Sequence, residues 1–317
     1  MKHTFSTTTT LIILFFLAQI IGIGILTQYI DFQTTAETGD TTLREETYFV
    51  APPSVTEETF SFIPIFIAIL LATGLIFLII KFGSFKLWRS WFVLSVSVAL
   101  SFAFYPFLQI LIPSQTIAIM LTICLALMLG IFKVIRSNQH IHNITEIFMY
   151  GGLAAILVPI LNIYSAIILL LLIAIYDFYM VFVSKHMVTL AQSSMDSQML
   201  AGIWVKTQIG HRTVSKNITP PKRRVGRPKK LVDPAPHKPY QTAAKAIIGG
   251  GDIAFPLLFA GAVMKFTGSV LSGFIIAAFA TLAVLLLFTL GRKDMFYPAM
   301  PPITLGCIIG LVVALLL

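Results

Sequence analysis

Two acidic side chains, Asp177 and Asp252, lie deep inside long apolar segments of the chain. Asp177 occurs in LLLLIAIYDFYMVFVS and Asp252 in AIIGGGDIAFP, whereas Glu146 falls at the end of an apolar segment and is expected at the membrane interface. Burying a carboxyl group in a bilayer costs at least about 2.5–3.5 kcal/mol, so such residues are expected to be functional. No basic residue occurs in the deep part of an apolar segment, which argues against a structural ion pair.

Two carboxyl groups about 3 Å apart do not readily ionise together, so such a pair holds one proton near neutrality. The ionised member can take a proton from a water molecule while the protonated member polarises a peptide carbonyl. If Asp177 and Asp252 meet, they predict aspartic proteolysis without a covalent intermediate.

The positions of the two residues along the chain predict that they do meet. Asp177 lies eight residues before Lys185, and Asp252 lies seven residues after Lys245. At about 1.5 Å per helical residue, both are expected roughly 10–12 Å below the same membrane surface.

Glycine and proline surround these acids. Gly249, Gly250 and Gly251 directly precede Asp252, and with Pro256 they predict a loosely helical segment that a neighbouring helix or an extended substrate backbone can approach closely. The sequence FYPAMPPI contains Pro298, Pro301 and Pro302 at the start of the last apolar segment. Such prolines either begin a helix or form a rigid turn that lines a cavity.

The elements that position these residues are predicted to be transmembrane helices. The chain has 317 residues, of which 57% are hydrophobic and 11% charged, which indicates an integral membrane protein. We expect an all-α, polytopic fold with nine spans near residues 9–30, 60–82, 90–112, 115–134, 145–161, 163–184, 244–264, 268–290 and 297–317. The predicted organisation is a membrane domain over 1–184, a cytoplasmic loop over 185–243 and a second membrane domain over 244–317.

The distribution of Lys and Arg predicts a cytoplasmic N-terminus and a C-terminus outside. Apart from the long loop, eight such residues fall inside, namely Lys2, Lys81, Lys86, Arg89, Lys133, Arg136, Arg292 and Lys293. Two fall outside, Arg44 and Lys265.

The long loop contains PPKRRVGRPKKLVDPAPHKP, which favours a solvated, flexible connector. Its RVGRPKK segment resembles an AT-hook, but contact with anionic lipid headgroups is favoured over nucleic-acid binding. Cys124 and Cys307 both lie in apolar segments, and no zinc-protease motif occurs, so no metal and no cofactor are expected.

Three motifs in this order resemble the presenilin and signal peptide peptidase family of intramembrane aspartyl proteases. They are Tyr176-Asp177, Gly249-Gly250-Gly251-Asp252, and Pro298-Ala299-Met300 followed by Pro301. Met300 stands where the family usually has leucine, a change that preserves volume and apolarity. The resemblance covers about residues 145–317 by motif and the whole chain by span count, and the predicted orientation is that of presenilins.

This resemblance implies that Asp177 and Asp252 form a catalytic dyad that cleaves transmembrane segments of protein substrates. Residues implied to shape the site are Tyr176, Gly249, Gly250, Gly251, Pro298, Ala299, Met300 and Pro301. The protein would be a multi-pass membrane protein, of the cell membrane if it is microbial. Oligomeric state, accessory subunits and self-cleavage of the loop stay open.

A proton-coupled transporter or a cation leak channel is the alternative, because paired intramembrane acids also mark ion pathways. The odd number of predicted spans and the lack of visible symmetry between halves favour the protease.

Overall fold

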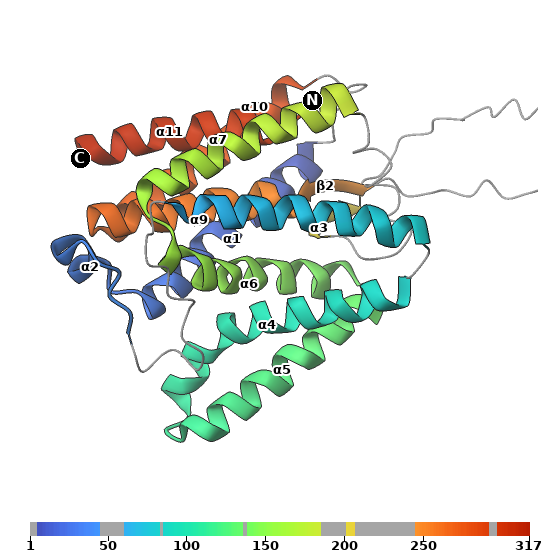
Figure 1. Cartoon of the computed structure of the whole chain (residues 1–317), viewed down its shortest axis with the longest axis vertical. Helices are drawn as coiled ribbons and strands as arrows, with labels where there is room; N and C mark the ends of the chain where they lie inside the picture. Colours follow the sequence, from blue (N-terminus) through green and yellow to red (C-terminus); the bar gives the residue numbers. More distant parts are fainter. Residues whose placement is uncertain are drawn as a thin grey trace, which may run out of the picture.

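The computed structural model describes residues 5–44, 60–82, 85–135, 138–184, 201–206, 245–291 and 297–317 (Figure 1). The long helices are α1 (Phe5–Tyr29), α3 (Phe62–Phe82), α4 (Phe85–Leu111), α5 (Gln115–Ile135), α6 (Gln139–Leu157), α7 (Ile163–Tyr179), α9 (Gly250–Thr267), α10 (Val270–Leu290) and α11 (Met300–Leu316). The shorter elements are helix α2 (Phe32–Thr38), a 3₁₀ turn (Val158–Ile160), a π-helical turn (Met180–Ser184), and the strands β1 (Gly202–Lys206) and β2 (Lys245–Gly249).

Six described helices are long and apolar enough to cross a membrane, namely α1, α4, α5, α6 with its 3₁₀ turn, α7 and α10. Helices α3 and α11 lie within two of the other predicted spans, and α9 overlaps the third, 244–264, but ends three residues later at Thr267. Large apolar side chains such as Leu71, Met120 and Ile175 are 69%, 67% and 66% exposed, as expected for helices that face lipid. The protein is therefore a mostly helical, multi-pass integral membrane protein.

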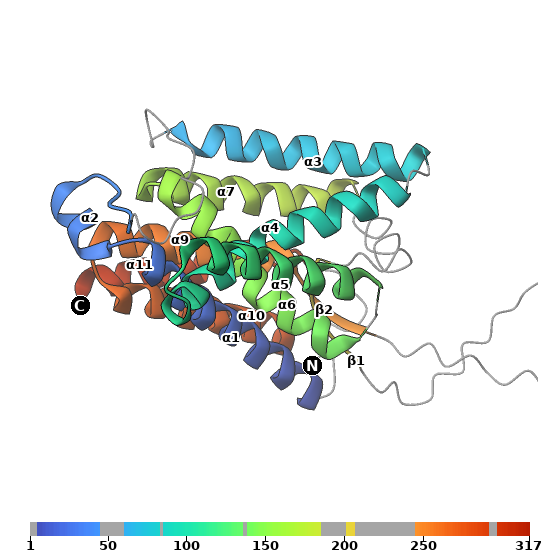
Figure 2. The same cartoon turned by 90° about the horizontal axis from the view of Figure 1, so that it is seen from below.

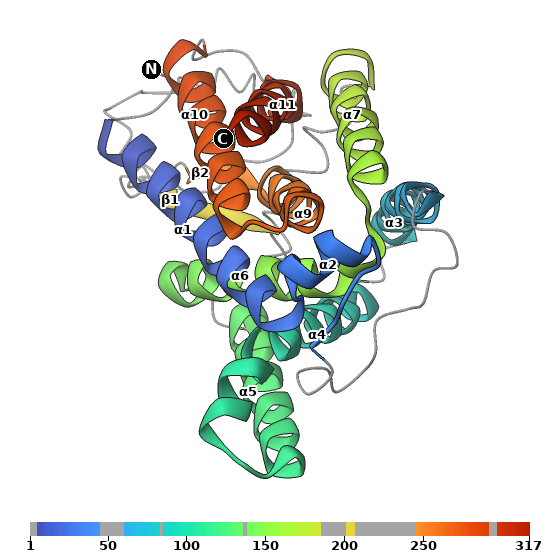
Figure 3. The ribbon, with the colours of Figure 1, turned by 90° about the vertical axis from the view of Figure 1, so that its left-hand side faces the viewer.

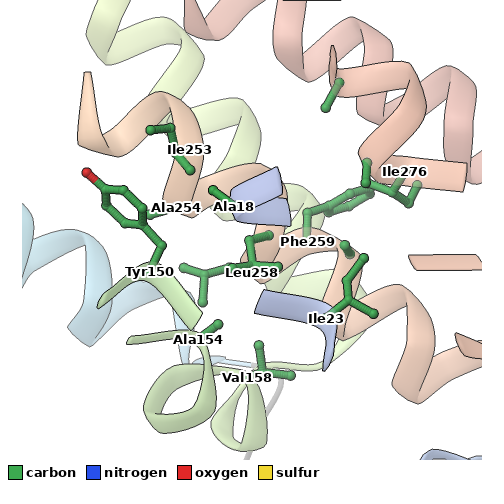
Figure 4. Packing of buried hydrophobic residues seen from close by; sticks show 14 of the residues in the cluster. Ala18, Ile23, Tyr150, Ala154, Val158, Ile253, Ala254, Leu258, Phe259 and Ile276 are labelled. Atoms are coloured by element: carbon green, nitrogen blue, oxygen red, sulfur yellow. The ribbon is translucent and has the colours of Figure 1, made fainter. Parts of the chain in front are cut away.

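Helix α9 lies at the centre of the bundle, packed against α1, α6, α7, α10 and α11 (Figure 3). Its residues 256–265 are all buried, so this part of the helix has no lipid-facing side. Figure 4 shows Leu258 and Phe259 of α9 beside Ile23 of α1 and Val158 of the 3₁₀ turn after α6. The segment predicted to be loosely helical is divided in the structure: Gly249 is extended, and α9 runs as a helix from Gly250 through Pro256.

The remaining helices surround this centre. Helices α4 and α5 pair with each other and pack against α6, whereas α3 runs beside α7 (Figure 2). The start of α1 and the two strands lie at one end of the bundle, and the end of α11 lies at the other (Figure 1).

Strands β1 and β2 are antiparallel, with Gly202 opposite Gly249 and Lys206 opposite Lys245. This sheet corrects two predictions. Residues 202–206, which lie in the predicted flexible loop 185–243, form a strand. Of this loop the structure describes residues 201–206, and RVGRPKK lies outside the described residues. The seventh span begins as a strand, and its helix starts at Gly250 rather than near 244. The apolar KAIIG sequence satisfies hydropathy in either conformation, and its β-branched residues favour a strand.

Charged side chains at helix ends are also placed differently from the prediction. Glu146 is fully buried, and its Oε1 lies 2.5 Å from Nζ of Lys133 and 3.7 Å from Nε2 of His142. Lys265, expected in an outer loop, is buried and donates to the carbonyls of Pro159 and Leu161 at 3.0 and 2.9 Å. These lysines satisfy buried acceptors, because unpaired polar groups in this environment are costly.

Candidate active site

Asp177 lies near the C-terminal end of α7, one turn before the helix widens into the π-helical turn Met180–Ser184. The Oδ2 atom of Asp177 accepts a hydrogen bond of 3.0 Å from the backbone N–H of Met300. Met300 is the first residue of α11, where backbone N–H groups have no partner within the helix. The helix start therefore supplies a donor and a positive dipole end to this carboxyl group.

The turn from Pro298 to Pro301 thus contacts Asp177 through its backbone. The residue before α11 is Ala299, and the Met300 side chain is 2% exposed within the core. Of the two roles that the sequence left open for these prolines, the start of a helix is what the structure has, because α11 begins at Met300 with prolines in its first turn. The backbone N–H groups of Met300 and Ala299 both donate to the Asp177 carboxyl group.

Asp252 lies in the first turn of α9, which follows the extended residue Gly249. The backbone N–H of Gly249 donates to the Asp252 carboxyl group. This is half of a capping box, in which the third residue of a helix reaches back to the residue before its first turn. Strand β2 leads directly into the helical turn that carries Asp252. The distance from Lys245 to Asp252 is therefore spanned mainly by extended residues, not by the seven helical residues assumed from the sequence.

The three glycines differ in the room around them. A Cβ atom on Gly250 would lie 2.7 Å from the Tyr150 hydroxyl, and one on Gly249 would lie 3.1 Å from Oδ2 of Asp252. A Cβ atom on Gly251 would make only an ordinary contact of 3.4 Å with Phe255. None of the three has a positive φ angle, so close approach rather than backbone conformation explains Gly250.

The structure places the two acids on helices that pack against each other, α7 and α9. Asp177 lies within electrostatic range of the Asp252 carboxyl group. Neither carboxyl group forms an ion pair with another described residue. Two like charges in an apolar interior with no cation beside them are the arrangement in which one proton is shared.

Helix α6 holds the outer edge of β1 through side chains. The Asn143 amide both donates to the Trp204 carbonyl at 2.9 Å and accepts from the Trp204 N–H at 3.2 Å. His142 Nε2 lies 2.9 Å from the Gly202 carbonyl, and Gln139 accepts from the Lys206 N–H at 3.3 Å. Asn143 therefore takes the place of a neighbouring strand, and the edge of β1 is occupied.

Tyr176 is half-buried beside Asp177, and within the described residues its side chain makes no hydrogen bond. No group of three His, Cys, Asp or Glu side chains that could hold a metal ion occurs in the described ranges.

Residues 45–317 match the sequence profile of a family described as signal-peptide peptidase, presenilin aspartyl protease. The chain belongs to this family. No curated protein matches the chain.

Two solved structures share the presenilin-family fold with this chain. Both are of a presenilin family intramembrane aspartate protease, one in a C222 and one in a P2 crystal form. The first is 17% identical, with 98% of each chain covered and a TM-score of 0.59. The second is 18% identical, with 97% of this chain and 96% of the other covered and a TM-score of 0.61.

Several supports of the site are not predicted by the presenilin-family motifs. They are Gln19, Gln139, His142, Asn143 and Tyr150. One signal was available for α6, where polar residues 139, 142, 143 and 146 recur at the spacing of one helix face. Another was Gln19, an isolated polar residue within an apolar segment.

Proposed function

We propose that the protein is an intramembrane aspartic endopeptidase in which Asp177 and Asp252 activate a water molecule. The observation that carries this proposal is the placement of the two acids on the contacting helices α7 and α9, within electrostatic range of each other and without a cation from the described residues. The presenilin-family match supports the same chemistry.

In the proposed reaction, the ionised carboxylate takes a proton from water as the water oxygen attacks the peptide carbonyl carbon. The protonated carboxyl group donates its proton to the carbonyl oxygen, which gives a neutral tetrahedral diol. When this diol collapses, the C–N bond breaks, the nitrogen receives a proton and the carboxyl pair returns to its starting state. The N–H groups of Gly249 and Met300 stabilise the ionised forms of Asp252 and Asp177, respectively.

Strand β2 supplies a binding edge for an unwound substrate segment. Because residues 202, 204 and 206 of β1 direct their backbone groups to α6, residues 203 and 205 pair with β2. The alternation of a strand then directs the backbone of Ile247 and Gly249 to the opposite edge, beside Asp252. A peptide added to this edge would present its backbone to the dyad.

We further propose nine spans, a cytoplasmic N-terminus and a C-terminus outside. Lys133 and Lys265 are buried, which leaves seven Lys or Arg residues inside and one outside, still in the predicted sense. The start of α1 and the end of α11 lie at opposite ends of the bundle, as an odd number of spans requires (Figure 1).

The test is cleavage of a transmembrane peptide by the purified full-length protein in detergent. Asp177→Asn and Asp252→Asn should each reduce turnover by at least about 10²–10⁴-fold, because each removes one partner in proton transfer. Asp40→Asn, in the exposed turn after α2, is the matched control and should retain turnover. Full activity of either dyad variant would refute the assignment, and ion flux in liposomes without cleavage would favour the transporter or channel.

The pH profile gives a second test. Since one carboxyl group must be protonated and the other ionised, turnover should fall on both sides of a maximum. The acid limb reports protonation of the base, and the alkaline limb reports loss of the shared proton. A profile with one limb only between the limits of protein stability would contradict a two-carboxyl mechanism.

A further inference from the structure

Gln19 is a fully buried amide in the middle of α1. From Leu11 to Leu26, all the other residues of this helix are apolar or glycine. A polar group in such a place is costly unless it is hydrogen-bonded. Its presence therefore requires a partner on a neighbouring element.

The partner is the backbone of α9 beside Asp252. Gln19 Nε2 donates a hydrogen bond of 2.9 Å to the carbonyl of Ile253, the residue that follows Asp252. The carbonyl is an acceptor, so the amide nitrogen must face it, and Oε1 has no hydrogen-bond partner among the described residues.

The first turn of α9 has a specific need for such a contact. Pro256 has no N–H, so the Asp252 carbonyl lacks the donor that the fourth following residue normally supplies. The turn that carries Asp252 is consequently joined to the rest of α9 by one hydrogen bond fewer. Gln19 donates a hydrogen bond to the carbonyl of the next residue, Ile253.

The two helices are close enough for this contact because of a glycine on α1. A Cβ atom on Gly22 would lie 2.3 Å from Cδ2 of Leu257. Gly22 is one turn after Gln19, and Leu257 is one turn after Ile253. The approach of α1 to α9 and the reach of the Gln19 amide are therefore parts of one contact.

We propose that Gln19 is a positioning residue that holds Asp252 at the dyad through the carbonyl of Ile253. This role rests on the proposed protease function. Gln19 does not touch the reacting atoms, so its removal should change the rate of the chemical step more than substrate binding.

The experiment compares three variants of the full-length protein in the transmembrane-peptide assay. Gln19→Leu, similar in size but without a donor, should lower kcat by about 10- to 100-fold with a smaller change in KM, as displaced catalytic groups do. Gln28→Leu makes the same change in a half-buried residue of α1 and should leave kcat unchanged. Equal kcat values for Gln19→Leu and Gln28→Leu would overturn the proposal.

Gln19→Glu supplies a readout that packing alone would not change. The introduced carboxyl group can donate to the Ile253 carbonyl when it is protonated, whereas its ionised form places two acceptors against that carbonyl. The kcat of this variant relative to the unaltered protein should therefore decrease as pH rises, and a ratio independent of pH would overturn the proposal. This variant decides the matter if Gln19→Leu does not fold. Inactivity of the unaltered protein refutes the protease function itself, whereas normal Gln19 variants beside inactive dyad variants refute only this inference.

Discussion

The two carboxyl groups of the site lie on helices in different surroundings. Asp252 is on α9, which packs against five long helices and the short helix α2 and is buried over residues 256–265. Asp177 is on α7, where the neighbouring side chains of Ile175 and Phe178 are 66% and 53% exposed. The helix with Asp252 is held by the interior of the bundle, and the helix with Asp177 is held at its edge.

Different contacts compensate for this difference. The Asp252 carboxyl group accepts from the Gly249 N–H, and the carbonyl of the next residue, Ile253, accepts from Gln19. The Asp177 carboxyl group accepts from the N–H groups of Met300 and Ala299. A displacement of α7 would disturb fewer packed side chains than a displacement of α9. A movement on the α7 side therefore has the lower cost in packing.

The largest expected effect concerns the buried charges behind β1. Lys133→Met leaves Glu146 buried without its ammonium partner and should lower the free energy of unfolding by about 3–5 kcal/mol. The double variant Lys133→Met/Glu146→Leu should recover most of this loss. Lys206→Met, on the exposed end of β1, is the control. Thermal unfolding in detergent measures the stability of all three variants. An unchanged unfolding midpoint for Lys133→Met would show that the buried ion pair does not stabilise the bundle.

The same substitution on the two helices tests the comparison directly. Phe259 of α9 is 1% exposed, and Phe259→Ala should lower the free energy of unfolding by about 3 kcal/mol through the cavity it leaves. Phe178→Ala on α7 removes a ring that is 53% exposed and should have less than about half that effect. Equal losses in denaturant titrations would show that α7 is held as firmly as α9.

Alanine substitutions of the glycines before Asp252 should differ in their effect on stability according to the space around each glycine. Gly250→Ala places a methyl group against the Tyr150 hydroxyl and should lower stability by about 1–3 kcal/mol. Tyr150→Phe in the same chain should restore much of that loss, which a double-mutant cycle measures.

Gly251→Ala is the matched control, with little effect on folding, whereas Gly251→Leu should fold but turn over substrate poorly because it fills the approach to the dyad. Equal destabilisation by alanine at both positions would show that helix propensity, not space, decides.

The smallest effect is expected at Met300. Because its backbone N–H contacts Asp177, Met300→Leu should preserve turnover and change stability by less than about 1.5 kcal/mol. Cleavage and thermal unfolding can be followed on the same preparation. A large loss of turnover would indicate that the side chain, rather than the backbone, determines the contact.

Much of this arrangement could be predicted from the sequence. Hydropathy located each of the nine described long helices, and the scarcity of buried acids singled out Asp177 and Asp252. Hydropathy could not separate β2 from α9, because KAIIG is apolar in both cases. Only pairing with residues 202–206 makes this segment a strand. Gln19 and Asn143 act through backbone groups distant in sequence, and no local pattern identifies such a partner.

The Asn143 amide has a consequence for the protein in a crowded membrane. An open strand edge is a site at which two copies of a chain can join and aggregate. Asn143 occupies both backbone groups of Trp204, so the sheet can accept a new strand on the β2 side only. One asparagine thereby gives a two-stranded sheet a single direction of growth and protects the protein from unwanted self-association along β1.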